Sequence, residues 1–117
     1  MKIFLDTADT DIISKYFETG LVDGVTTNPT LIMKSGRNPE DVYEDIRDIG
    51  VKDISMEVVG NADDMTAEGV RLYQKFGDVC TVKVPCTREG LETCKKLSDL
   101  GIKVNVTLIF CAAQAVL

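Results

Sequence analysis

The chain has 117 residues, the length of one modest domain, and its 44% hydrophobic residues are enough for a packed core. Its net charge of −6 argues against nucleic acid and anionic membranes as partners, because binding them calls for a basic patch that displaces counterions. The sequence lacks histidine, so acid–base chemistry must fall to Asp, Glu, Lys, Tyr or Cys.

Cysteine spacing and the apolar tracts argue against two further classes, zinc-binding proteins and membrane-spanning proteins. No C-x-x-C pair occurs, which disfavours a zinc site, and we interpret the cysteines as reduced thiols of a cytoplasmic protein. The longest apolar tract, residues 104–117, contains Asn, Thr and Gln and falls short of the roughly 18–20 residues that a membrane span needs. Residues 1–5 are too short for a signal peptide.

Strands and helices alternate from the N-terminus onward. Apolar alternation between turn and cap residues predicts strands over residues 3–6, 24–27, 53–58, 79–84 and 104–109. Helices are predicted over residues 30–34, 38–50, 61–76 and 87–101, with a first helix that begins at Thr7 or Asp9 and a last one that begins at residue 111. The first helix is expected to bury Ile12, Ile13, Tyr16 and Phe17.

The strand–helix unit repeats about every 25 residues, which predicts a parallel sheet covered by helices. A doubly wound sheet and a (β/α)₈ barrel both fit this repeat, and eight such units would need about 200 residues. Because the chain ends inside a predicted helix, we expect residues 1–117 to be the N-terminal portion of a single barrel domain.

Polar residues recur near the C-terminal ends of the strands, on one face of each. A barrel explains them, because these faces converge on its axis and its active sites lie at that end, whereas a doubly wound sheet packs both faces against helices. The candidate site residues are Asp6, Asn28, Glu57, Lys83, Asn105 and Thr107, with Thr26 as a further member.

One amine among carboxylates, amides and hydroxyls suits Schiff-base chemistry. A partly desolvated lysine such as Lys83 loses its charge more easily and can attack a ketone, and a carboxylate with a hydroxyl-held water can shuttle the protons. A structural ion pair of Lys83 with Asp6 and Glu57 is the alternative interpretation.

Four segments resemble a known family. They are Asp6-Thr7-Ala8; residues 24–32, G-V-T-T-N-P-T-L-I; residues 82–85, V-K-V-P, with Thr87, Glu89 and Gly90; and residues 105–110, N-V-T-L-I-F, with Ala113-Gln114-Ala115. Together they resemble the transaldolase family, and most closely its small subgroup, which includes the fructose-6-phosphate aldolases. The resemblance covers essentially the whole chain in order.

This resemblance implies a (β/α)₈ barrel of the class I aldolase type, with catalytic roles for four residues. Lys83 would form the Schiff base with the donor ketose phosphate, and Asp6 would take the proton from the donor's C4 hydroxyl. Glu57, with Thr107, would hold the water that relays protons while the imine forms and hydrolyses.

The resemblance also implies how substrate is held. Asn28 and Asn105 would bind and orient the dihydroxyacetone unit, with Thr26 lining the site, and the phosphate-binding residues would follow residue 117. No metal or organic cofactor is implied, and the expected partners are sugar phosphates and further copies of the chain in a homo-oligomer.

Two positions separate the family's activities. The aldolases that release free dihydroxyacetone typically carry Gln at the position of Glu57 and lack the Asn at position 105, so both residues favour a transaldolase. The alternatives are a fructose-6-phosphate aldolase, which is a lyase, and an inactive half-barrel that self-associates through its open edges.

Overall fold

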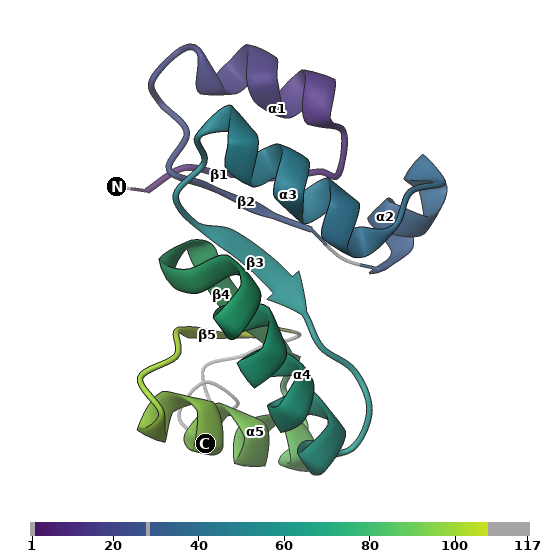
Figure 1. Ribbon diagram of the computed structural model, residues 1–117, viewed down its shortest axis with the longest axis vertical. Helices are drawn as coiled ribbons and strands as arrows, with labels where there is room; N and C mark the ends of the chain where they lie inside the picture. The colour runs from purple at the N-terminus through teal and green to yellow at the C-terminus, as the bar shows by residue number, and fades with distance from the viewer. Residues whose placement is uncertain (1, 28, 108–117) are drawn as a thin grey trace.

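The computed structural model describes residues 2–27 and 29–107 and shows an α/β fold built on one five-stranded parallel sheet (Figure 1). The strands are β1 (Phe4–Asp6), β2 (Gly24–Thr26), β3 (Ile54–Glu57), β4 (Cys80–Pro85) and β5 (Val104–Thr107). All five predicted strands are present, whereas the helix predicted from residue 111 lies outside the described residues.

Five α-helices and one 3₁₀ turn connect the strands. They are α1 (Thr10–Phe17), α2 (Pro29–Ser35), α3 (Pro39–Ile49), α4 (Ala62–Phe76), η1 (Gly77–Val79) and α5 (Arg88–Asp99). Asp9, and not Thr7, caps α1, because its carboxylate accepts from the first free N–H groups of the helix. Asn38 caps α3 ahead of Pro39, so this helix begins where the sequence predicts.

The limits of β4 differ from the prediction at both ends. Val79 belongs to η1, and Pro85 continues the strand and pairs with Thr107 of β5. The Val82 N–H points to β5, so alternation turns position 85 toward β3, which has already ended. Proline has no N–H, but at position 85 this costs the sheet no hydrogen bond, because the strand that the N–H would face has ended.

The strand order distinguishes the two predicted architectures. The strands follow one another across the sheet in chain order, without the reversal that a doubly wound sheet requires. Right-handed crossovers that all run in one direction place every helix on the same face. Helices α3, α4 and α5 pack on β3, β4 and β5 (Figure 1), so the arrangement is that of a β/α barrel.

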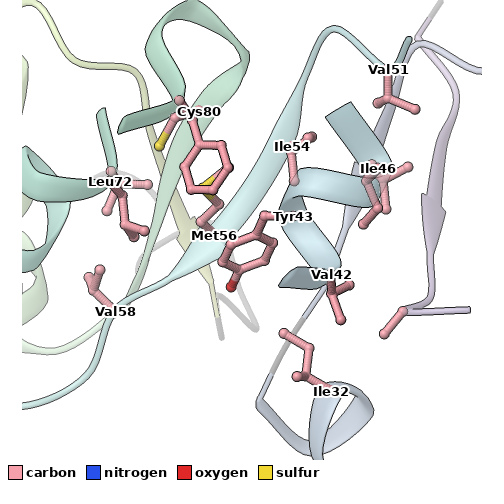
Figure 2. Close-up of a cluster of buried hydrophobic side chains, with 14 of the residues drawn as sticks. Ile32, Val42, Tyr43, Ile46, Val51, Ile54, Met56, Val58, Leu72 and Cys80 are labelled. Carbon is pink, nitrogen blue, oxygen red and sulfur yellow. The ribbon is translucent and has the colours of Figure 1, made fainter. Parts of the chain in front are cut away.

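The core lies between the sheet and its helices. Ile54 and Met56 of β3 are fully buried against side chains from α3 and α4 (Figure 2). In α1 the predicted stripe is too wide: Ile13 is completely buried, but Ile12 and Tyr16 are 42% and 47% exposed. The reason is that α1 packs mainly along one side, on α3.

Ion pairs connect α3 and α4 at the surface. The Lys75 ammonium lies 2.7 Å from the Glu40 carboxylate and 3.1 Å from that of Glu44, and Arg71 also pairs with Glu40. Hydrogen bonds from Lys75 and then Arg71 lower the pKa of the Glu40 carboxyl. Within residues 2–27 and 29–107, no helix is long and apolar enough to cross a membrane.

Gly90 permits the close approach of α5 to the end of β4. An alanine Cβ at this position would lie 1.9 Å from the Pro85 carbonyl oxygen, so the backbone would have to move. We expect Gly90→Ala to lower the free energy of unfolding in urea by about 2 kcal/mol or more. Gly69→Ala is the control, because its Cβ would meet the flexible Leu97 side chain; equal losses for the two variants would contradict this packing argument.

Candidate functional site

The parallel register brings three of the predicted site residues into one row. Glu57 of β3 pairs with Lys83 of β4, and Lys83 pairs with Asn105 of β5. Side chains of a strand alternate between its faces. Because Met56 and Val82 are buried on the side of the helices, the row lies on the opposite face, as the sequence predicted.

A second row crosses the other half of the sheet. Asp6 of β1 pairs with Thr26 of β2, which pairs with Ser55 of β3. The Thr26 hydroxyl donates to the Asp6 carboxylate at 3.1 Å, so the two predicted residues are in direct contact. Asp6, Thr26 and Glu57 are each the last residue of their strand, at the C-terminal edge of the sheet.

Lys83 reaches across β3 toward the end of β2. Its Nζ donates to the backbone carbonyl oxygen of Thr27 at 3.4 Å, and its side chain is half-buried. In the described part of the chain Lys83 forms no ion pair with any carboxylate, Asp6 and Glu57 included. The alternative of a structural ion pair among these three residues is therefore wrong for this structure.

Two of the three remaining predicted site residues lie in β5, and the third is not among the described residues. Asn105 lies in β5 with an exposed side chain, and Thr107 is the last residue of the same strand. Asn28 lies outside the described residues. The row of Glu57, Lys83 and Asn105 and the pair of Asp6 and Thr26 are therefore the parts of the site that the structure brings together.

Sequence reasoning missed two residues next to this site. The Thr27 side chain is completely buried, and its hydroxyl donates to the Ser55 carbonyl at 3.3 Å while its own carbonyl receives Lys83. Its place at the end of a strand, directly before Asn28-Pro29, was the available signal. No such signal pointed to Tyr43 of α3, because its position in the sequence is that of one more core residue of an amphipathic helix.

Burial controls the titration of two groups on the helix-covered side of the sheet. It raises the pKa of the Tyr43 phenol, an effect that hydrogen bonds to the Thr27 side chain and the Glu57 backbone partly offset. Burial also raises the pKa of the Cys80 thiol to about 11. Among the described residues, no group of three or more Asp, Glu or Cys side chains is placed to hold a metal ion.

These features define a class: a β/α-barrel protein whose candidate site is centred on a lysine at the C-terminal ends of the strands. The family model described as Transaldolase/Fructose-6-phosphate aldolase matches residues 3–117. The chain belongs to this family.

Individual relatives support the same assignment. The chain is 52% identical to a probable transaldolase of Nitrosopumilus maritimus, 53% to one of Paracoccus denitrificans and 51% to one of a Ruegeria species. Each alignment covers all of this chain but 53% of the first relative and 54% of the other two. The chain thus spans about half the length of the curated relatives it matches.

The buried Cys80 thiol should resist alkylation. A pKa of about 11 leaves on the order of one thiol in a thousand ionised at pH 8, and the thiolate is the reactive form. We expect iodoacetamide at pH 8 to label the partly buried Cys86 and Cys94 in the native protein but Cys80 only after unfolding in urea. Equal native labelling of all three, read by peptide mass spectrometry, would contradict this burial.

Proposed function

We propose that the intact protein is a transaldolase, which transfers a dihydroxyacetone unit from a ketose phosphate to an aldose phosphate through a Schiff base on Lys83. The observation that carries the proposal is a half-buried amine without an ion-pair partner among the described residues, in a row with Glu57 and Asn105. An amine that no carboxylate holds is available to attack a carbonyl carbon. The name probable transaldolase, carried by relatives, supports the same reaction.

The proposed steps balance without a cofactor. The Lys83 amine attacks the C2 carbonyl of the ketose, and the carbinolamine loses water to form an iminium. A carboxylate then removes the proton of the C4 hydroxyl, the C3–C4 bond breaks, and its electron pair moves into the iminium to give an enamine. The aldehyde leaves, an aldose phosphate takes its place, and the reverse steps release the new ketose.

We assign the proton transfers to the two carboxylates at the strand ends. Asp6 takes the C4 hydroxyl proton, and its contact with the Thr26 hydroxyl fixes one of its oxygens. Glu57, next to Lys83 in the register, holds with Thr107 the water that relays protons during imine formation and hydrolysis. Their location on different strands allows the two carboxylates to take separate roles.

Substrate binding is assigned to the amide side chains. Asn105 lies beside Lys83 in the register, within the reach of a short ketose bound to the amine, and Asn28 follows the end of β2. The partners are sugar phosphates, and phosphate binding is assigned to residues outside this chain. The proposal includes a cytoplasmic location and a homo-oligomer.

Trapping the Schiff base tests the assignment of Lys83. Borohydride added to the intact protein with fructose 6-phosphate should attach the reduced sugar to Lys83, and Lys83→Ala should lower transfer to erythrose 4-phosphate at least about 1,000-fold. Lys95→Ala is the control, since it removes a surface lysine paired with Asp99 on α5. An unmodified Lys83, found by peptide mass spectrometry in protein that still catalyses transfer, would refute the assignment.

Glu57 is expected to separate transfer from release. Glu57→Gln keeps the size of the side chain but removes its charge, and we expect it to lower the transfer rate about 100-fold and to raise the ratio of free dihydroxyacetone to transfer product. Glu44→Gln is the control for loss of one carboxylate near the surface. If free dihydroxyacetone is already the main product of the unmodified protein, the lyase alternative is correct.

A further inference from the structure

Thr27 combines a buried side chain with a backbone carbonyl that contacts the amine of Lys83. The side chain is completely buried, and alternation along the chain places it on the helix-covered side of the sheet, with Val25. The carbonyl oxygen accepts a hydrogen bond from Lys83 Nζ at 3.4 Å. Thr27 therefore connects the packed core on one side of the sheet to the amine on the other.

The Thr27 hydroxyl bonds to the backbone of β3. It donates to the carbonyl oxygen of Ser55 at 3.3 Å. A buried hydroxyl without an acceptor would cost about 1–3 kcal/mol, whereas valine would fill a similar space with no polar group to satisfy. Packing alone therefore gives no reason for a hydroxyl at this position, and the reason must lie in what the hydrogen bond holds in place.

This hydrogen bond lies where β2 and β3 stop pairing. Their register ends at Thr26 and Ser55. The Val25 N–H donates to the Asp53 carbonyl at 2.9 Å, so in a continued parallel ladder the Ser55 carbonyl would receive the N–H of Thr27. In the structure the same carbonyl accepts the Thr27 hydroxyl. A side chain thus holds residue 27 to β3 beyond the last pair of strand residues.

The same anchor fixes the Thr27 carbonyl relative to Lys83. Lys83 extends from β4 and crosses β3 to reach the end of β2. The chain leaves the sheet directly afterwards, since α2 begins at Pro29, so the β2–β3 ladder no longer holds this carbonyl. Because the hydroxyl and the carbonyl belong to one residue, a hydrogen bond that fixes the first restricts rotation of the second.

We infer that Thr27 is a positioning residue for Lys83, because its hydroxyl anchors the backbone whose carbonyl holds the amine. Without the anchor the carbonyl is free to turn away, and the amine loses its acceptor. The amine then meets a small aldehyde from solution more easily, but it is less often in the geometry that a bound ketose requires. The effect on catalysis rests on the proposed Schiff-base function, whereas the effect on the amine itself does not.

Thr27→Val removes the hydroxyl and keeps the branched side chain, whereas Thr27→Ser keeps the hydroxyl. In the intact protein we expect Thr27→Val to lower the kcat for transfer about tenfold, with the KM for fructose 6-phosphate changed less than twofold. Thr27→Ser should keep the kcat within about twofold of the unmodified protein. Equal kcat values for the two variants would overturn the catalytic part of the inference.

Thr93→Val is the matched control. Thr93 of α5 is also completely buried, and its hydroxyl donates to the carbonyl oxygens of Glu89 at 2.9 Å and Ala62 at 3.3 Å. The variant therefore reports the loss of a buried hydroxyl in the helix layer. We expect its kcat to stay within about twofold of the unmodified protein, and a tenfold fall in both valine variants would refute a specific role of Thr27.

A measurement without sugar separates this inference from the proposed function. Reductive methylation with formaldehyde and cyanoborohydride, followed at each lysine by peptide mass spectrometry, reports how freely the Lys83 amine reacts. We expect its rate relative to Lys95 to rise at least threefold in Thr27→Val, but not in Thr27→Ser or Thr93→Val. An unchanged relative rate would overturn the inference even if Lys83 forms the sugar adduct, and a raised rate without an adduct would sink the proposed function alone.

Thr27→Ala provides a second variant in case valine disturbs the core. It removes the hydroxyl that bonds to Ser55 but keeps the carbonyl that receives Lys83. We expect the relative methylation rate of Lys83 to rise at least threefold here too. A rate equal to that of the unmodified protein in Thr27→Ala would refute the positioning role, whatever the behaviour of Thr27→Val.

Discussion

The parallel register of β3, β4 and β5 is the constraint on which the site depends. Because side chains alternate along a strand, a slip of one residue would turn Lys83 toward the helices, into the space that Val82 fills against Gly69 of α4. Burial of an unpaired ammonium there would cost several kcal/mol. The apolar face of the sheet therefore selects the register, and the register places the amine between Glu57 and Asn105.

The ends of the strands then give these residues different surroundings. At the ends of β1 and β2, Asp6 is in contact with Thr26. The pairing of β2 with β3 ends at Thr26 and Ser55, and the carbonyl of the next residue, Thr27, accepts a hydrogen bond from Lys83. The helices support the sheet from outside, since ion pairs connect α3 to α4. Packing and site geometry are thus parts of one arrangement.

Much of this could be predicted from the sequence, because periodicity and capping are local. The strands, the start of α3 at Asn38 and the shared face of Glu57 and Lys83 follow from local sequence patterns. The exposed Ile12 could not be predicted, since it depends on how much of α1 its neighbours cover. The contact of Lys83 with the Thr27 carbonyl could not be predicted either, because it depends on where two strands stop pairing.

Catalysis through Lys83 is tested most directly by a crystal structure of the intact protein after borohydride reduction with fructose 6-phosphate. We expect continuous density from Lys83 Nζ to C2 of the sugar, with Asn105 beside the sugar and the nitrogen close to the Thr27 carbonyl oxygen. An unmodified Lys83, or an adduct on a lysine outside the row of Glu57, Lys83 and Asn105, would contradict it.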